Sequence, residues 1–238
     1  MYNGHSVSVV FPAFNEEEGI AHAVETFLAQ EPVDEVVVVD NNSRDRTAEL
    51  AAQAGARLVT ETAQGYGNAL RRGLAEASGD LIVMAEPDGT FAAEDVHKLL
   101  AYSSDAELVL GTRTTREMIF SEANMGWFLR WGNWAVAKMQ QVLFNTPSLS
   151  DCGCTMRLIH RSALLRFLDR LTVGASHFLP EMVILAHRSG ASMIEVPVSY
   201  RPRRGTSKIT GDLKGTIEVG INMMALIVAY RVGLSAPR

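Results

Sequence analysis

Short apolar runs alternate with segments of helical spacing along the first half of the chain. Five apolar runs, several of them rich in β-branched residues, predict strands at 6–11, 35–40, 57–60, 80–85 and 107–111. Apolar residues at helical spacing between these runs predict helices over 16–29, 45–54, 66–78 and 92–102. The four consecutive valines at 36–39 predict a central strand that is covered on both faces.

Strands that alternate with helices are typical of an α/β fold. The first 111 residues therefore predict a doubly wound, Rossmann-like and mostly parallel sheet with helices on both faces. Ligands of such sheets bind at the carboxyl ends of the strands. Asp40, Glu86 and Asp88 all follow predicted strands, so we expect them to lie at that edge of the sheet.

The pattern changes after residue 111. Residues 117–145 are mostly of helical spacing, strands are predicted at 155–159 and 192–198, and helices at 176–189 and 213–230. Because the chain has no linker-like composition and no internal repeat, we expect one domain over residues 1–238. Within it, 1–111 would form a nucleotide-sugar-binding half, and 112–238 an acceptor half with an amphipathic C-terminal helix.

Charge and composition exclude several classes of protein. A net charge of −5 gives no general attraction to nucleic acid. The N-terminus lacks the basic and apolar regions of a secretory signal, and no segment reaches the roughly 18 apolar residues of a membrane span. Cys152 and Cys154 are too close for a typical structural disulfide, which favours a reducing, cytoplasmic compartment.

Two acids separated by one residue stand at the end of a predicted strand. Carboxylates such as Glu86 and Asp88 can share a hard divalent cation, Mg²⁺ or Mn²⁺, which neutralises a diphosphate leaving group. The alternative interpretation is a solvated acidic turn.

Two further segments could contact a nucleotide. Asp40 can accept hydrogen bonds from a base edge, while Ser43 or Asn42 can cap the helix that follows. Gly65 and Gly67 precede a predicted helix and would let backbone N–H groups approach a phosphate, although a glycine turn required only for steric reasons explains them equally well.

Four of these segments, in this order, resemble motifs of family 2 glycosyltransferases: Pro12-Ala13-Phe14-Asn15-Glu16, the run VVDNNSRDRT, Gly65-Tyr66-Gly67-Asn68-Ala69 and Glu86-Pro87-Asp88. Later segments are similar to the polyprenyl-phosphate sugar synthases, of which dolichol-phosphate mannose synthase is the type member: Gly111-Thr112-Arg113, Arg130-Trp131-Gly132-Asn133, 151–157 and 203–208.

This resemblance implies a GT-A fold and inverting transfer of a sugar from a GDP- or UDP-sugar to a polyprenyl phosphate. By position it implies nucleotide contacts from Pro12, Phe14, Glu16, Asp40 and Asn41, and phosphate or diphosphate contacts from Gly65, Gly67, Glu86 and Lys208. It also implies a metal site at Asp88, Glu86 and Thr90. Catalytic roles are implied for Asp88, Arg113, Arg130 and Arg203. Arginine suits such a site because its forked donors grip phosphate.

The chain departs from the family pattern at four positions. Glu86 replaces Asp, Phe14 replaces Tyr, Asn41 replaces a second acid, and Thr90 stands where relatives often have a stronger ligand. A soluble or polysaccharide acceptor is the main alternative, although the Q-x-x-R-W motif of polymerising relatives is absent. A nucleotide-sugar-binding protein without catalysis is the third hypothesis.

Two surfaces invite further predictions. The basic loop at 201–208 could close over phosphate or be an ordinary surface loop. Trp127, Trp131 and Trp134 share a helical stripe, and a second apolar stripe lies on the terminal helix at Ile217, Ile221, Met224 and Val228. They predict docking on the inner face of a membrane without spanning it, or alternatively packing in the core.

Overall fold

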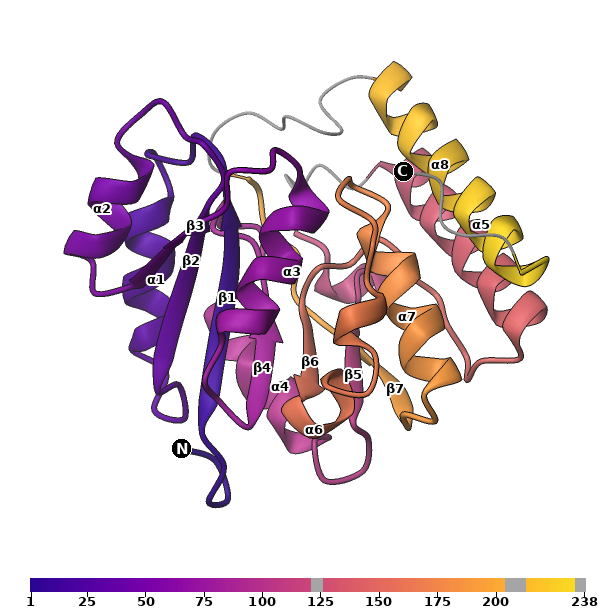
Figure 1. Ribbon diagram of the computed structural model, residues 1–238, viewed down its shortest axis with the longest axis horizontal. Coiled ribbons are helices and arrows are strands. Elements are labelled where there is room, and N and C mark those ends of the chain that lie inside the picture. Colours follow the sequence, from indigo (N-terminus) through magenta and orange to yellow (C-terminus); the bar gives the residue numbers. More distant parts are fainter. Residues whose placement is uncertain (121–125, 204–212, 234–238) are drawn as a thin grey trace.

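The structure is a computed structural model that describes residues 1–120, 126–203 and 213–233. A seven-stranded sheet runs through its centre in the order β3-β2-β1-β4-β6-β5-β7 (Figure 1). The strands are β1 Val7–Ala13, β2 Glu35–Asp40, β3 Arg57–Thr60, β4 Leu81–Met84, β5 Leu108–Thr112, β6 Arg157–His160 and β7 Met193–Pro197. Strands of both predicted halves therefore join one sheet.

Most neighbouring strands are parallel, and β6 is the exception. The strands β3, β2, β1 and β4 pair in parallel, as do β5 and β7, whereas β6 runs antiparallel between β4 and β5. The register places Asp40 opposite Ala13 on β1, and Met84 opposite Arg157 on β6. The carboxyl ends of β1, β2 and β4 consequently meet at one edge, where the start of β6 joins them.

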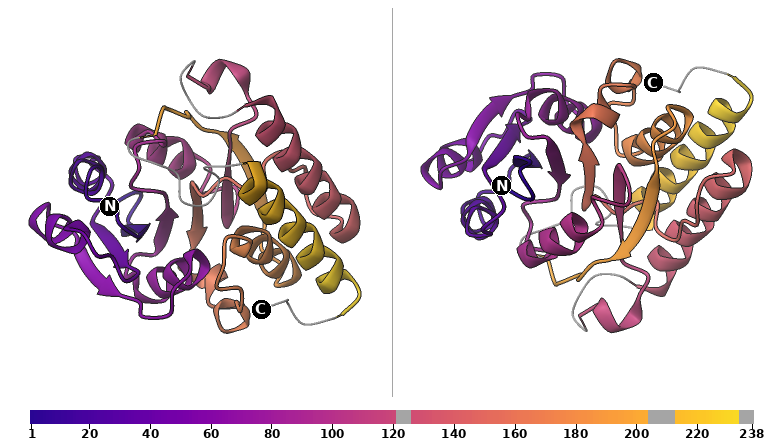
Figure 2. Two further views of the ribbon diagram at one scale, coloured as in Figure 1. Left: turned by 90° about the horizontal axis from the view of Figure 1, so that it is seen from above. Right: turned by 90° about the horizontal axis from the view of Figure 1, so that it is seen from below.

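Helices cover both faces of the sheet (Figure 2). The α-helices are α1 Ile20–Leu28, α2 Thr47–Gln53, α3 Tyr66–Glu76, α4 Val96–Ala101, α5 Trp127–Phe144, α6 Arg161–Leu164, α7 Phe178–Arg188 and α8 Leu213–Arg231. One apolar core joins the sheet to α1, α2 and α4, and the other joins it to α3, α5, α6, α7 and α8.

The valine run in β2 feeds both cores. Val36 and Val38 belong to the core beneath α1, while Val37 and Val39 belong to the core beneath α3. All four are at most 1% exposed, and each fully buried valine stabilises the fold by roughly 1.5 kcal/mol or more relative to an exposed one. The prediction of a strand covered on both faces is confirmed.

Several helix boundaries differ from the predicted ones. The first helix begins at Ile20 rather than residue 16, because Asn15 adopts a left-handed φ of 53° and a turn follows it. The helix predicted from residue 92 begins with a 3₁₀ turn at Ala93–Asp95. The short helix α6 and the 3₁₀ turn at Leu168–Arg170 were not predicted, since segments of three or four residues carry no periodic signal.

Helices α5 and α8 lie side by side at one end of the molecule (Figures 1 and 2). The stripe predicted on the terminal helix faces outward: its members Ile217, Ile221, Met224 and Val228 are 41–54% exposed. The opposite side of α8, including Leu226 and Ile227, is buried, so this helix is apolar on both sides. None of the helices in the described part of the chain is both long and apolar enough to cross a membrane.

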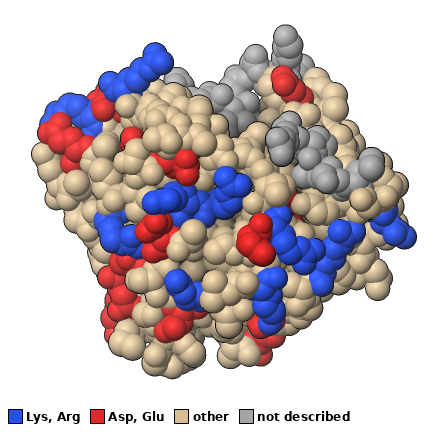
Figure 3. Space-filling model, in the orientation of Figure 1, with Lys and Arg blue, Asp and Glu red and all other residues tan. Residues whose placement is uncertain are grey.

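The indole side chains of α5 are also partly outside the core. Trp131 is 56% exposed and Trp134 is 40% exposed, and their rings meet edge to face with centroids 5.3 Å apart. Full core packing of this stripe is therefore wrong for these two residues, whereas the side chain of Trp127 lies outside the described residues. On the face shown in Figure 3, acidic and basic side chains are interspersed.

Candidate active site

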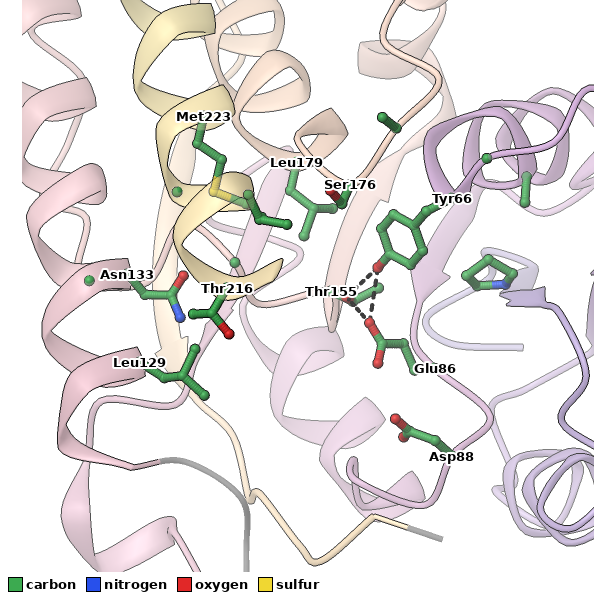
Figure 4. A pocket seen from close by; sticks show the side chains of 18 of the residues that line it. Tyr66, Glu86, Asp88, Leu129, Asn133, Thr155, Ser176, Leu179, Thr216 and Met223 are labelled. Carbon is green, nitrogen blue, oxygen red and sulfur yellow. Dashed lines mark hydrogen bonds between the residues drawn. The ribbon is translucent and has the colours of Figure 1, made fainter. Parts of the chain in front are cut away.

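A cavity of about 800 Å³ opens at the carboxyl edge of the sheet, between the two predicted halves (Figure 4). Its polar end includes Glu16, Glu86, Asp88, Arg113, Tyr200 and Arg203. Its less polar end includes Leu129, Val136, Ile217, Ile221, Met223 and Met224 of α5 and α8 and Leu179 of α7, with the polar side chains of Asn133 and Thr216 among them (Figure 4). One cavity thus joins a charged site to an apolar groove.

Asp88 is held rigidly at the polar end. It is 1% exposed, and its Oδ1 accepts hydrogen bonds from the backbone N–H of Thr90 (2.9 Å) and from the Thr90 hydroxyl (2.6 Å). Thr90 does not line the cavity, and in this structure its two hydrogen bonds hold the Asp88 carboxylate in place. The other oxygen, Oδ2, accepts no hydrogen bond of good geometry from a described residue.

Glu86 points towards two hydroxyl groups from other elements (Figure 4). Its Oε1 accepts hydrogen bonds from Tyr66 (3.0 Å) and Thr155 (2.7 Å), whose hydroxyl oxygens lie 2.5 Å apart. Burial, together with the negative charge of Asp88, raises the pKa of Glu86 to about 7. Glu86 can therefore exchange a proton near neutral pH, and its Oε2 is the oxygen that these two hydroxyl groups leave free.

Arg203 bridges two carboxylates across the cavity. Its Nη2 lies 2.9 Å from Glu16 Oε1, and its Nη1 lies 2.8 Å from Asp88 Oδ2. Burial alone would lower the pKa of Arg203, but the charges of Asp88 and Glu16 raise it. The guanidinium therefore stays charged and neutralises part of the acidic end.

Arg113 follows β5 directly and forms a second, more buried ion pair. Its Nε lies 2.8 Å from Asp151 Oδ2 and its Nη2 lies 2.9 Å from Asp151 Oδ1. Burial would raise the pKa of Asp151, but the charge and hydrogen bonds of Arg113 hold it below its usual value. This bidentate geometry fixes the plane of the guanidinium.

The side of the cavity next to the carboxyl ends of β1 and β2 contains Pro12, Phe14 and Asn41. The Asn41 amide nitrogen donates to the carbonyls of Glu61 and Ala63, and its oxygen accepts from the Gly65 N–H at 2.7 Å. Asn41 therefore ties down the segment 61–65. Its neighbour Asp40 is 9% exposed and does not line the cavity, although its buried Oδ1 has no described hydrogen-bond partner.

Gly65 and Gly67 have a steric role in the fold. A Cβ on Gly65 would lie 2.3 Å from the carbonyl oxygen of Gly174, and one on Gly67 would lie 2.3 Å from that of Val173. Gly65 also has a φ of 144°, which disfavours other residues. Gly65 lines the cavity but Gly67 does not, so close packing against the turn at 173–175 explains both glycines without a phosphate.

That turn is fixed by a buried carboxylate. Glu181, which is fully buried, accepts hydrogen bonds from the backbone N–H groups of Thr172 and Val173. It also accepts one from the hydroxyl of Tyr230 on α8, at 2.7 Å. The terminal helix is thereby connected to the turn that supports Gly65 and Gly67.

The cavity gathers most of the predicted site residues. Those that line it are Pro12, Phe14, Glu16, Asn41, Gly65, Glu86, Asp88, Arg113 and Arg203. Those that do not are Asp40, Gly67, Thr90 and Arg130. Lys208 and most of the predicted basic loop lie outside the described residues.

Four polar residues of this site were not predicted from the sequence: Tyr66, Asp151, Thr155 and Tyr200. Their positions depend on pairing between distant segments. In the antiparallel register of β4 and β6, Met84 faces Arg157, which brings Thr155 opposite Glu86 beyond the strand ends. Asp151 could have been suspected, because it begins one of the segments that resembled the synthases.

Glu86 and Asp88 would hold a metal ion only together with ligands from substrate or water. Among the described residues, no three His, Cys, Asp or Glu side chains are placed to hold a cation together. Asp88 Oδ2 is nevertheless a buried carboxylate oxygen that accepts no hydrogen bond from the residues described, among which Arg203 forms an ion pair with it. Such an oxygen can serve a hard cation whose remaining ligands come from substrate or water.

Comparison with known proteins shows the family to which this chain belongs. The family profile described as "Glycosyl transferase family 2" matches residues 8–168. An uncharacterized glycosyltransferase of Mycobacterium tuberculosis (strain H37Rv) is 34% identical over 219 residues, which cover 90% of this chain and 94% of the relative. A dolichyl-phosphate hexose transferase of Haloferax volcanii is 28% identical over 98% of this chain and 99% of its own length.

The fold is also found in solved structures. Glucosyl-3-phosphoglycerate synthase of M. tuberculosis, crystallised with Mn²⁺, UDP and glucosyl-3-phosphoglycerate, superposes with a TM-score of 0.73. The match covers 99% of this chain and 82% of that chain, at 21% sequence identity. The predicted GT-A fold is thereby confirmed.

Proposed function

Since the chain belongs to glycosyl transferase family 2 and is a glycosyltransferase, we propose that it transfers a sugar from a GDP- or UDP-sugar to a polyprenyl phosphate, with inversion at the anomeric carbon. The observation that carries this proposal is the single cavity with two unlike ends. A donor diphosphate and an acceptor phosphate suit the charged end, whereas an isoprenoid chain suits the groove between α5 and α8.

The composition of the groove favours an acceptor with a long apolar part. Leu129 and Val136 of α5 line it together with Ile217, Ile221 and Met224 of α8, whose side chains are also partly exposed to solvent. A small sugar phosphate would leave this apolar surface in contact with water. At roughly 25 cal/mol per Å², covering it with hydrocarbon contributes to acceptor affinity.

Relatives with lipid acceptors support this proposal. Besides the dolichyl-phosphate hexose transferase, an undecaprenyl-phosphate 4-deoxy-4-formamido-L-arabinose transferase of Pectobacterium atrosepticum is 30% identical over 85% of this chain and 62% of its own length. The names of these proteins specify a polyprenyl-type phosphate as acceptor.

The proposed reaction makes one bond and breaks one. An oxygen of the acceptor phosphate attacks the anomeric carbon, and the bond from that carbon to the donor diphosphate breaks. Because a lipid phosphate is already ionised, the protein needs mainly to align it and to stabilise the departing nucleotide. Arg113 and Arg203 line the cavity, and in this proposal they would bind phosphate oxygens.

We propose Mg²⁺ or Mn²⁺ as the cofactor. Asp88 would hold it, with Glu86 close by, and the bound ion would neutralise charge on the leaving diphosphate. Thr90 keeps the Asp88 carboxylate in one orientation for this purpose. Phe14 lines the cavity and would contact the base of the nucleotide.

The exposed side chains of α5 and α8 favour action at a membrane surface. Trp131 and Trp134 lie outside on α5, and the outward stripe of α8 begins with Ile217. Tryptophan prefers the interface between lipid and water. Docking by this end on the inner face of a membrane would place the groove beside the lipid that it binds.

A soluble phosphorylated acceptor is the second candidate. It is favoured by the structural likeness to glucosyl-3-phosphoglycerate synthase, whose crystals contained a phosphorylated three-carbon acid or its glucoside. The apolar groove argues against it, because such an acceptor has no apolar part to fill the groove.

The deciding experiment offers both acceptors to the purified protein. We expect transfer from one member of a panel of GDP- and UDP-sugars to a polyprenyl phosphate, dependent on Mg²⁺ or Mn²⁺ and abolished by excess chelator. Transfer to 3-phosphoglycerate but not to the lipid would overturn the proposed acceptor. Full transfer in chelator would overturn the proposed cofactor.

A further inference from the structure

The two cavity arginines are held in different ways. Arg203 lies between Glu16 and Asp88, both of which line the cavity. Arg113 instead pairs with Asp151, a carboxylate that is 1% exposed at its side chain and does not line the cavity. Arg113 therefore lines the cavity, whereas the carboxylate that holds it lies outside the lining.

Asp151 holds Arg113 by three hydrogen bonds. The backbone N–H of Arg113 donates to Asp151 Oδ2 at 3.0 Å, and the same oxygen accepts from Nε at 2.8 Å. The other oxygen, Oδ1, accepts from Nη2 at 2.9 Å and from the Gly153 N–H at 3.1 Å. Both the backbone and the guanidinium of Arg113 are thus fixed, and Nη1 is the nitrogen that Asp151 does not bind.

The other side of the guanidinium meets an aromatic ring. The Cζ atom of Arg113 lies 5.2 Å from the ring centroid of Tyr200, which also lines the cavity. The cation–π contact and the bidentate ion pair together restrict the orientation of the guanidinium.

A second carboxylate fixes Asp151 in turn. Glu195 of β7 accepts hydrogen bonds at Oε1 from the backbone N–H groups of Ser150 (2.9 Å) and Asp151 (3.0 Å), and at Oε2 from the Ser150 hydroxyl (2.6 Å). Arg113 follows β5 directly, and Asp151 is bound by Glu195 of β7. Because β5 and β7 are adjacent strands, the sheet fixes the two partners of the ion pair relative to each other.

We propose that Asp151 is a positioning residue, which fixes Arg113 in one orientation for a phosphate of the substrate, and that Glu195 fixes Asp151. Without Asp151, Arg113 could swing to the cavity carboxylates Glu86 and Asp88, as Arg203 already does to Asp88. Fixing the side chain beforehand also removes the entropy cost of immobilising it when a ligand binds, an effect on the order of tenfold in affinity. This inference rests on the proposed function, from which the phosphate ligand is taken.

A double-mutant cycle tests the proposal. The variants are Asp151→Asn, Arg113→Met and the two combined, and the probes are UDP and citronellyl phosphate, a short isoprenoid phosphate. We expect Asp151→Asn to weaken binding of one probe at least tenfold, with the other probe changed less than about threefold. The double variant should bind that probe no more weakly than Arg113→Met alone, because Asp151 acts through Arg113.

Turnover gives a readout that a merely structural role would not move. If the coupled probe is the acceptor, Asp151→Asn should raise the acceptor KM while leaving the donor KM unchanged. Glu35→Gln is the matched control, since Glu35 also pairs with an arginine, Arg57. Glu35 lies at the start of β2, at the edge of the sheet away from the cavity. It should lower thermal stability without changing either affinity.

The outcomes separate this proposal from the proposed function. Additive effects of Asp151→Asn and Arg113→Met, or no effect of Arg113→Met on either probe, would overturn the positioning role. Coupling seen with UDP in a protein that does not glycosylate the lipid phosphate would keep the positioning role and reject the proposed acceptor. If Asp151→Asn does not fold, Glu195→Gln, which leaves the pair intact, should give a smaller loss for the same probe, and an unchanged affinity would overturn the proposal.

Discussion

Arg203 lies beside Asp88 where an incoming cation would lie: its Nη1 is 2.8 Å from Oδ2 of a carboxylate that is 1% exposed. The same guanidinium reaches Glu16 with Nη2 at 2.9 Å. A divalent cation and Arg203 would compete for the same oxygen, because two positive charges close to one carboxylate oxygen repel each other. Metal binding at Asp88 would therefore be coupled to the position of Arg203.

Replacing Arg203 by Met should strengthen Mn²⁺ binding to the protein without nucleotide. We expect roughly a tenfold gain, since removal of a competing charge from a buried carboxylate is worth on the order of 1.4 kcal/mol. In the presence of UDP the gain should shrink or reverse, because the variant lacks an arginine that we propose to bind phosphate. Isothermal titration calorimetry measures both affinities.

Arg201→Met serves as the control for that experiment. The side chain of Arg201 pairs with the exposed Glu94 at 3.6 Å, whereas that of Arg203 pairs with Asp88. Its loss should leave Mn²⁺ affinity unchanged. Equal or weaker Mn²⁺ binding in the Arg203 variant without nucleotide would contradict the competition.

Glu86 should make the stability of the metal-free protein depend on pH. Burial and the charge of Asp88 raise its pKa from 4.5 to about 7, so the folded state holds a proton that the unfolded state has released between these values. Its contribution is fully present below pH 4.5 and is lost as the pH rises through about 7.

The variant Glu86→Gln removes this titration while keeping the shape of the side chain. Its melting temperature should rise relative to the parent as the pH increases from about 4.5 to about 7, and the difference should level off above that range. Melting curves across this range measure it. Parallel curves for parent and variant would show that Glu86 does not hold the proton.

Anionic vesicles should bind the end of the molecule that carries α5 and α8. Trp131 and Trp134 are exposed enough to respond, so tryptophan emission should shift to shorter wavelength when vesicles containing phosphatidylglycerol are added. Replacing both by Ser should lower co-sedimentation with the vesicles about tenfold or more. Tyr102→Ser, which alters an exposed aromatic residue after α4, should have no effect. Unchanged emission and no co-sedimentation would contradict membrane binding by this surface.

Gly67→Ala should destabilise the fold even though Gly67 lies outside the cavity. Its new Cβ would lie 2.3 Å from the carbonyl oxygen of Val173, and relieving such a contact costs about 1–3 kcal/mol. Gly132→Ala is the contrasting variant: it lies in α5 with nothing within 4 Å of the added atom, so it should stabilise by up to about 1 kcal/mol. The urea midpoints measure both. Equal midpoints for the parent and Gly67→Ala would refute the close packing.

The sequence predicted best what depends on local pattern. The valine run of β2 and the helical spacing of α3 reflect burial of the residues themselves, so their boundaries are nearly correct. Glu86, Asp88 and Arg113 were found because strand ends of an α/β sheet converge on one edge.

The supporting contacts of the site could not be predicted in the same way. The hydrogen bond from Thr155 to Glu86 spans 69 residues and requires β6 to enter the sheet antiparallel beside β4. The role of Asn41 depends on where the segment 61–65 folds back, and the reason for Gly67 lies about a hundred residues away, at Val173. No periodicity within one segment carries such information.

The hydrogen bond from Tyr230 to Glu181 limits how this chain can be shortened. A protein cut before Tyr230 would lose the hydrogen bond from the Tyr230 hydroxyl to Glu181 as well as the end of α8. Glu181 would then keep only its hydrogen bonds to the turn at 172–173. That turn supports the two glycines ahead of α3. Removal of the C-terminal end of α8 should therefore disturb the cavity wall at Gly65, and this helix is an integral part of the fold rather than a detachable anchor.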